Sequence, residues 1–379
     1  MAFELTRDDL RDLVRGAALL GTGGGGDPSI GRTLVSEALR DGRSVTIVSP
    51  DELDDDDYVV PTAFMGAPSV LVERLPGGTE AIDALRALEA HTGQRATATM
   101  PIESGGINST IPLFVAARHG IPVVDADGMG RAFPELQMET FAVYGVDGPP
   151  LAIADERGDT AIVDTGSDNK KMENWARVLT VQMGGVSHIA AYGMRGADIR
   201  RTAIPGTLSL ALALGRTLRE AREQHRDPMG ALKDALADTL YERGDVIFTG
   251  KVVDVDRRTV EGFTRGRATI AAFDGDASCT IDFQNEFLLA KVDGRTRAIV
   301  PDLVTVLHME TGEPITAESL RYGNRVHVFA ISTPEMMRTP EALRVFGPSA
   351  FGVDEDFVPF EQLPVGSHSS VVPEKEVAE

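Results

Sequence analysis

The sequence predicts an α/β protein, in which an N-terminal parallel-sheet domain of βαβ units precedes a C-terminal mixed domain with a β-rich barrel- or sandwich-like module. Helix and strand patterns alternate along the first 130 residues, and this rhythm is typical of parallel strands with both faces covered. Residues 246–333 instead form a run of strand patterns separated by Asp-Gly and Arg-Gly turns. Such a run is typical of an antiparallel module.

Each element of the N-terminal domain has its own signal. The predicted helices combine apolar residues at helical spacing with capping residues or a terminal glycine, and they are expected over residues 6–21, 27–42, 78–93 and 107–120. The predicted strands are short apolar or β-branched runs, expected over residues 44–49, 58–65, 95–103 and 121–128. Strand and helix therefore alternate as βαβ units require.

The rest of the chain divides by pattern in the same way. Residues 140–165 alternate like β structure, whereas residues 170–245 have mainly helical patterns. We therefore predict two domains, 1–168 and 169–364, the second with a helical part (170–245) and a β-rich part (246–333). Residues 365–379 are polar and contain a proline, so a disordered tail is expected there.

Composition restricts the function classes. The 379 residues carry a formal net charge of −21, and such a field repels phosphate backbones and anionic lipids, so neither nucleic acid nor membrane is an expected partner. No apolar run approaches the roughly 20 residues of a membrane span. The chain shows no secretory-signal pattern and has one cysteine, Cys279, which fits a reducing compartment. We expect a cytoplasmic protein.

The first candidate site is the glycine run "GTGGGGDP" at residues 21–28. Its letters satisfy G-x-G-x-x-G, but the dinucleotide fingerprint needs a preceding strand, and the preceding residues have a helical pattern; the Lys-Ser/Thr of a P-loop is also missing. Glycines adopt positive φ and can direct several N–H groups at one point beside a helix start. An anion or carbonyl oxygen could therefore bind there, although a flexible link between two helices is the alternative. The binding residues would be Gly23, Gly24, Gly25, Gly26 and Asp27.

Two further glycine-containing turns, "MPIESGGINSTIP" and "VVDADGMGRAFPELQM", carry acids. Parallel sheets bind ligands beyond the carboxyl ends of their strands, so these turns should meet the glycine loop in one crevice. Crowded carboxylates shift one another's pKa and can act as a general base or bind a divalent metal, whereas helix capping is the alternative for any single residue. The candidates from these turns are Glu103, Ser104, Asn108, Asp125, Asp127, Arg131 and Glu135.

Other polar residues carry weaker signals. Glu286 lies in the apolar strand pattern "TIDFQNEFLLA", where a carboxylate is either an edge group facing water or a site group. His188 is flanked by glycines and could face a pocket. His308 and His327 fit no zinc spacing, and Cys279 is expected to be a packed small residue. A divalent metal, if one is bound, would use Asp125, Asp127, Glu135 and His188.

Eight stretches together resemble, in the same order, the DUF917 family of S-methyl thiohydantoin desulfurase-like proteins, whose members are often neighbours of, or fused to, hydantoinase/oxoprolinase-type proteins. The stretches are "GTGGGGDP", "ESGGINSTIP", "VVDADGMGRAFPELQM", "AIPGTLSLALALGR", "GKVVDVDRRTVEGFTRG", "IDFQNEFLLA", "VPDLVTV" and "RTPEALRVFGPSAFG". The resemblance implies an α/β domain followed by a domain with a β-rich module. It also implies a hydrolase for a small hydantoin- or thiohydantoin-type ring, in which water displaces a methylthio group and methanethiol leaves.

The crevice residues suit the implied chemistry, because attack on an amidine-like carbon needs an activated water and a proton donor. The candidate catalytic residues are Glu103, Asp125, Asp127 and Glu135, and the ring would contact the glycine loop, Ser104, Asn108, Arg131 and Glu286. The sequence leaves the cofactor open, a divalent metal included. Two alternatives remain: a non-catalytic partner subunit of a hydantoinase/oxoprolinase-type complex, and a nucleotide-binding protein. We also expect a homo-oligomer and a hydantoinase-type partner.

Overall fold

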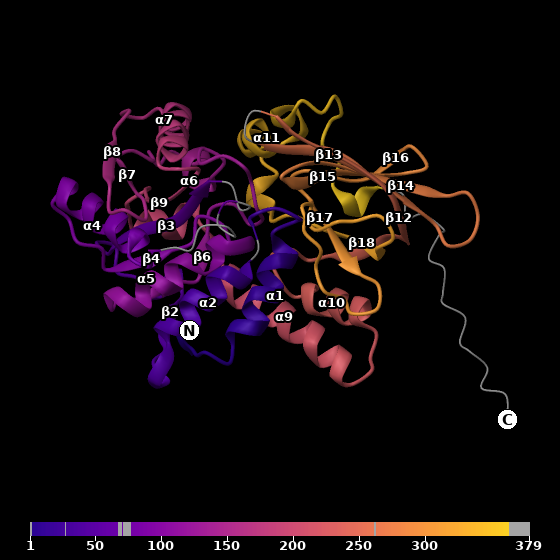
Figure 1. Cartoon of the computed structure of the whole chain (residues 1–379), viewed down its shortest axis with the longest axis horizontal. Helices are drawn as coiled ribbons and strands as arrows, with labels where there is room; N and C mark the ends of the chain where they lie inside the picture. Colours follow the sequence, from indigo (N-terminus) through magenta and orange to yellow (C-terminus); the bar gives the residue numbers. More distant parts are fainter. Residues whose placement is uncertain (1, 27, 67–69, 71–76, 261–262, 364–379) are drawn as a thin grey trace.

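The computed structural model describes residues 2–26, 28–66, 70, 77–260 and 263–363. Asp27 and the predicted tail at 365–379 lie outside these residues. Figure 1 shows a mixed sheet with its helices beside a separate antiparallel sheet, and the antiparallel sheet is built from the later part of the chain. The predicted α/β fold with a β-rich C-terminal module is confirmed.

The mixed sheet has a parallel centre and antiparallel edges. Its strand order is β1-β2-β5-β4-β3-β9-β7-β8, with β10 also on β3; β2, β5, β4 and β3 are parallel, and the others pair antiparallel. The bounds are β1 (Phe3–Leu5), β2 (Val45–Val48), β3 (Tyr58–Gly66), β4 (Ala98–Met100), β5 (Val123–Val124), β7 (Leu151–Ala154), β8 (Thr160–Val163), β9 (Val186–Ala190) and β10 (Met194–Arg195). The sequence did not predict β9, which lies within the stretch expected to be mainly helical.

Helices cover both faces of this sheet, because its central strand β3 is apolar on both sides. Val60 and Phe64 pack in one core with α4 and α5, and Val59 and Ala63 pack in a second core with α7 and α8. The helices are α1 (Leu10–Leu20), α2 (Pro28–Ala38), α4 (Glu80–Thr92), α5 (Ile111–His119), α6 (Thr140–Val143), α7 (Asn169–Gln182), α8 (Gly196–Thr202), α9 (Thr207–Glu223), α10 (Pro228–Leu236) and α11 (Pro340–Phe346). Short 3₁₀ turns are η1 (Arg40–Gly42), η2 (Pro50–Glu52), η3 (Gly106–Ser109), η4 (Glu335–Met337), η5 (Pro348–Phe351) and η6 (Phe360–Gln362).

The C-terminal sheet is antiparallel and curled. Its order is β16-β15-β14-β13-β12-β18-β17, and β15 and β16 also lie close to β17 at the opposite edge, so the sheet forms a half-barrel around its own apolar core. The bounds are β12 (Gly244–Val260), β13 (Phe263–Ala271), β14 (Ser278–Gln284), β15 (Glu286–Val292), β16 (Arg295–Ile299), β17 (Leu303–His308) and β18 (Arg325–Ile331). These strands fall where the turns of the sequence predicted them.

The predicted strand at 121–128 is divided at Asp125. Residues before it form β5, whereas β6 (Ala126–Asp127) pairs with β11 (Ile204–Pro205) in a separate two-stranded ribbon. The carboxylate of Asp125 accepts the N–H groups of Leu208 (2.9 Å) and Ser209 (3.0 Å) in the first turn of α9. Asp125 thereby attaches α9 to the carboxyl end of the parallel strands.

Helix α1, which leads directly into the glycine run, crosses α9 at glycine. A Cβ at Gly16 would lie 1.7 Å from the carbonyl oxygen of Ala211, and one at Gly215 would lie 1.7 Å from that of Asp12. Real atoms cannot approach so closely, so only glycine permits the two backbones to meet here. The crossing consequently fixes where α1 ends and where the glycine run begins.

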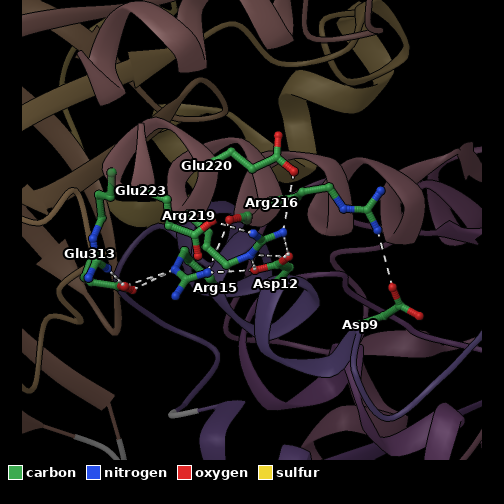
Figure 2. A network of polar contacts seen from close by, with 10 residues as sticks. Asp9, Asp12, Arg15, Arg216, Arg219, Glu220, Glu223 and Glu313 are labelled. Atoms are coloured by element: carbon green, nitrogen blue, oxygen red, sulfur yellow. Dashed lines mark hydrogen bonds and ion pairs between the residues drawn. The ribbon is translucent and has the colours of Figure 1, made fainter. Parts of the chain in front are cut away.

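Ion pairs surround this crossing and extend to the C-terminal sheet (Figure 2). Asp12 of α1 lies 2.9 Å from Arg15 and 3.0 Å from Arg219 of α9. Glu313, between β17 and β18, accepts Arg15 at 3.0 Å and Arg222 at 2.6 Å. The Arg222–Glu313 pair is half-exposed and contributes at most about 1 kcal/mol. Asp12, by contrast, is buried and accepts both Arg15 and Arg219. The glycine contact sets how closely the two helices approach, and the ion pairs join them around it.

Among the helices that the structure describes, none has both the length and the apolar character that crossing a membrane requires.

Adding one methyl group at the crossing should destabilise the fold. Gly16→Ala and Gly215→Ala should each lower the free energy of unfolding by about 1–3 kcal/mol, because the helices must separate. Gly230→Ala is the control, since a Cβ there meets only the Asp227 side chain, at 3.0 Å and beyond, and alanine favours the helix by up to about 1 kcal/mol. Urea unfolding measures all three; equal midpoints for the wild type and the two crossing variants would refute this close contact.

Candidate functional site

A cavity of about 310 Å³ lies where the two sheets meet, and several predicted residues line it. The glycine run, the turn after β4, the loop after β6, helix α7 and the β14–β15 turn all contribute to its wall. The predicted residues on the wall are Gly23, Gly24, Gly25, Gly26, Glu103, Asn108, Glu135 and Glu286. The segments that were expected to converge therefore do so, with the C-terminal sheet completing the site.

Four of the predicted catalytic and ring-binding residues do not line this cavity: Ser104, Asp125, Asp127 and Arg131. Asp125 caps α9, as described above. The hydroxyl of Ser104 donates to Thr207 Oγ1 at 2.7 Å. Asp127 and Arg131 lie behind the wall, where each holds other segments in place.

The glycine run adopts the backbone that its composition suggests. The φ angles are 48° at Thr22, 86° at Gly23, 70° at Gly25 and 75° at Gly26, a region that glycine enters freely and a β-branched residue enters at a cost. The carbonyl of Gly23 accepts Ala317 N–H and that of Gly25 accepts Ile107 N–H, both at 2.8 Å. The run is thus bonded to neighbouring segments on two sides, which argues against a plain flexible link.

The glycine run lies directly against Glu286. A Cβ at Gly24 would lie 2.1 Å from Glu286 Oε1, and the Gly25 N–H acts on the same carboxylate. The run was expected to bind a ligand anion or carbonyl oxygen. In the structure, the acidic group beside it belongs to the protein itself.

Arg131 connects the parts of the wall. Its side chain is completely buried, and its guanidinium donates to Asp302 O, Thr22 Oγ1 and Phe287 O, each at 2.8 Å. Burial lowers its pKa to about 10, against the raising effect of the charges of Glu286 and Asp302, so the group remains a cation at neutral pH. The sequence predicted Arg131 as a ring-binding residue, but its hydrogen bonds go to the protein.

Glu286, the first residue of β15, is one of two buried carboxyls that face the cavity. Its side chain is 2 % exposed, and Oε2 has no hydrogen-bond partner among the described residues. Burial raises the pKa of Glu286 to about 7, and the positive charge of Arg131 and the N–H groups of Glu286 and Gly25 limit that rise. Near neutral pH this carboxyl is therefore close to losing its proton.

Glu103 is the second buried carboxyl on the wall. Its Oε1 accepts Asn108 Nδ2 at 2.8 Å, while Oε2 has no hydrogen-bond partner in the described chain. Burial raises the pKa of Glu103 well above its usual value, and the negative charges of Glu286 and Asp127 raise it further; Asn108 and the nearby Phe133 N–H oppose the rise. Asn108 is fixed in turn, because its Oδ1 accepts Phe64 N–H at 2.7 Å.

Two more buried acids lie behind Glu103. Asp127 accepts Ser104 N–H at 2.5 Å and Gly130 N–H at 3.0 Å, and burial raises its pKa to about 7. Glu139 is completely buried, and neither of its carboxyl oxygens has a partner among the described residues. Sequence reasoning missed Glu139, because a glutamate directly before a short helix has the pattern of an exposed capping residue.

The four residues predicted as metal ligands do not form one site. Glu135 accepts Lys170 Nζ at 2.5 Å, and His188 lies on β9 with its ring 5.9 Å from that of Phe64, whereas Asp125 caps α9. Across the described chain, no group of three or more His, Cys, Asp or Glu side chains is arranged to hold a metal ion. The set Asp125, Asp127, Glu135 and His188 therefore does not fit one metal centre.

The wall also has polar residues that were not predicted as site residues, among them Arg177 and Asn285. Arg177 of α7 donates to Glu173 (2.5 Å) and to Pro134 O (3.1 Å), and its guanidinium lies 5.3 Å from the centre of the Phe263 ring. Asn285 forms the β14–β15 turn with φ 60°. The Gln-Asn-Glu sequence between two strand patterns was a signal for this turn, but nothing in the helix pattern of 170–245 distinguished Arg177.

Three other residues that the sequence left without a role lie elsewhere. His308 pairs with Glu310 at 3.2 Å, His327 Nδ1 is 2.8 Å from Thr249 Oγ1, and Cys279 is buried in the C-terminal sheet. None of the three lines the cavity.

The wall therefore presents two carboxyls with different proton affinities to one enclosed space. The Glu286 carboxyl, which is stabilised as an anion by the positive charge of Arg131, loses its proton more readily than Glu103, whose charge is stabilised by an amide and an N–H but by no cation. A pair of groups separated in this way can supply a general base and a general acid at the same pH.

Comparison with known proteins identifies the family of the chain. Residues 8–165 match the S-Me-THD-like, N-terminal domain, and residues 167–360 match the S-Me-THD-like, C-terminal domain. No curated protein matches the chain. A crystal structure of a protein from Chromobacterium violaceum is similar over 94 % of this chain and 100 % of that one, with a TM-score of 0.79 and 27 % sequence identity. The chain therefore belongs to the S-Me-THD-like family, the S-methyl thiohydantoin desulfurase-like proteins that its sequence motifs resemble.

Proposed function

We propose that the protein hydrolyses the C–S bond of a small S-methylated thiohydantoin-type ring, so that water replaces the methylthio group and methanethiol is released. One observation carries this proposal: two buried carboxyls, Glu103 and Glu286, line one cavity, and each has an oxygen without a protein partner. The cavity, about 310 Å³, is at the small end of ligand sites. A five-membered ring with a short substituent suits that volume.

In the first step, the Glu286 carboxylate removes a proton from a water molecule while the water oxygen bonds to the ring carbon that carries sulfur. Glu103 gives its proton to the adjacent ring nitrogen, which neutralises the charge that would develop there. The adduct carries hydroxyl and methylthio groups on one carbon. After this step Glu286 holds a proton and Glu103 is a carboxylate.

The second step restores both carboxyls. Glu103 takes the hydroxyl proton of the adduct, the carbon–oxygen double bond forms and the carbon–sulfur bond breaks. The departing methanethiolate receives the proton that Glu286 holds. The products are a hydantoin and methanethiol, one water has been consumed, and both side chains have their starting protonation states.

The wall is less suited to a nucleotide. Glu103, Glu135, Glu286 and Glu318 all line it, and the only Lys or Arg among its described lining residues, Arg177, is already paired with Glu173. A wall rich in acids, with its arginine already paired, disfavours phosphates. The second candidate function is a non-catalytic subunit of a hydantoinase-type complex, since the family resemblance implies an association with hydantoinase-type proteins. Such a subunit would bind the ring without releasing thiol.

We further propose that the protein works in the cytoplasm as a homo-oligomer, beside a hydantoinase-type protein. The hydantoin product supports this placement, since a ring-opening hydrolase is the class of enzyme that consumes it.

Removing either carboxyl should stop turnover without unfolding the protein. Glu286→Gln and Glu103→Gln should each lower kcat by about 10²–10⁴-fold, because each removes a proton-transfer group. The measurement is thiol released from an S-methyl thiohydantoin. Glu80→Gln is the matched control: Glu80 is equally buried, but it accepts backbone N–H groups at 78 and 79 and does not line the cavity. Wild-type rates in both cavity variants would refute the assignment.

The two roles fix the sign of the pH dependence. The base must be ionised, so kcat/KM should rise with pH through about 7, the pKa of Glu286. The acid must be protonated, so kcat/KM should fall again at higher pH, where Glu103, whose pKa is raised well above normal, loses its proton. A rate that falls through pH 7, or that stays constant from acid to alkaline pH, would contradict these roles.

A further inference from the structure

The buried acids around Glu103 outnumber the cations near them. Glu103, Asp127 and Glu139 are all within electrostatic range of one another, and Glu286 also acts on Glu103. Arg131, the fully buried cation among the described residues of this region, acts on Glu286 and Asp302. Three neighbouring carboxyls without a cation cannot all be charged, because each negative charge opposes the ionisation of the others.

Hydrogen bonding decides which of the three holds the charge. Asp127 accepts backbone N–H groups on both of its oxygens, from Ser104 on Oδ2 and from Gly130 on Oδ1. Glu103 accepts a side-chain amide N–H from Asn108 on one oxygen and is also acted on by the Phe133 N–H. Glu139 accepts none within the described chain. Donors directed at a carboxylate favour its ionised form, so Asp127 is the member that loses its proton first.

The neighbouring phenols do not alter this ranking. The Tyr241 hydroxyl donates to Gly130 O, and the Tyr192 hydroxyl donates to Leu136 O at 2.7 Å. Burial raises the pKa of both phenols well above normal, so they stay neutral. Neither gives its proton to Asp127 or Glu139.

The bonds of Asp127 also position the wall. Ser104 directly follows Glu103, and Gly130 directly precedes Arg131, so one aspartate joins the turn that carries the acid to the loop that carries the cation. Asp125, two residues earlier, makes a similar pair of bonds to α9 but none to these turns. Asp125 therefore holds helix α9, whereas Asp127 holds the two turns of the cavity wall.

We propose that Asp127 is a positioning residue: it carries the negative charge of the buried acid cluster and thereby keeps Glu103 in the protonated, proton-donating form, while Glu139 remains an uncharged acid behind it. This inference rests on the proposed function for its meaning, since a proton donor is needed only if the cavity is catalytic. The charge assignment itself can be measured without substrate.

The test follows the carboxylic-acid infrared band of Glu103, identified by its loss in Glu103→Gln, as pH is raised. In Asp127→Asn the Glu103 acid dissociation constant should increase at least about tenfold, because the neighbouring charge is gone. In Asp125→Asn, the matched control, it should not change. An unchanged constant in Asp127→Asn would overturn the proposal. If the wild type releases no thiol but the infrared shift is present, the proposed function fails and the charge assignment stands.

A second variant keeps the test decisive if Asp127→Asn does not fold. Glu139→Gln should leave the Glu103 titration unchanged, because Glu139 carries no charge while Glu103 titrates. An increase in the Glu103 dissociation constant in this variant would show that Glu139 rather than Asp127 carries the charge, and would refute the proposal.

Glu139→Gln should also change stability with a definite sign. The pKa of Glu139 is raised in the fold, so the folded state retains a proton that the unfolded chain loses above its ordinary pKa, and the wild type loses stability as pH rises from about 4.5. Glu139→Gln has no carboxyl at this position, so it does not lose stability in this way as pH rises. Its melting temperature should therefore exceed that of the wild type by more at pH 8 than at pH 5, whereas an equal difference at both pH values would contradict the burial of an unpaired acid.

Discussion

The site depends on one buried cation. The Arg131 guanidinium bonds at once to the hydroxyl of Thr22 in the glycine run, to the carbonyl of Phe287 in β15 and to that of Asp302 after β16. A guanidinium has rigidly placed donors and no acceptors, so it fixes the relative positions of the acceptors it reaches. The same cation lies near Glu286 and lets that carboxyl ionise near neutral pH.

This arrangement requires close contacts of the backbone that only glycine permits. Gly16 and Gly215 bring α1 against α9, and α1 then delivers the glycine run to the cavity; Gly24 allows the run to touch Glu286. Larger side chains at these places would separate either the helices or the wall. Asp125 binds the first turn of α9, so α9 is held at its N-terminus as well as at the glycine crossing in its middle.

Local patterns were sufficient for most of the fold. Helical spacing and turn residues placed α1, α4, α5 and the C-terminal strands, because these elements bury one face or lie between glycine-containing turns. Strand β9 was missed since its "VSHIA" sequence follows an amphipathic helix and resembles its continuation. The antiparallel pairing of β9 with β3 joins segments more than 100 residues apart, and no local pattern contains that information.

Local patterns also predicted part of the cavity wall. Glycines and acids at strand ends marked Glu103 and the glycine run, because the carboxyl edge of a parallel sheet is fixed by topology. The sequence could not predict which carboxylates face the cavity. Asp125 and Asp127 are two residues apart, yet Asp125 binds α9 and Asp127 binds the turn that carries Glu103. Glu139 and Arg177 acquire their surroundings only through tertiary packing.

The central claim is that two carboxyls of one cavity hold opposite protonation states just above neutral pH. The most direct measurement is a carbon-13 NMR titration of the protein labelled at glutamate side chains, with Glu103→Gln and Glu286→Gln used to assign the signals. The account predicts that Glu286 titrates near pH 7 and that Glu103 titrates at a higher pH. Both carboxyls titrating together near the ordinary glutamate value would contradict it.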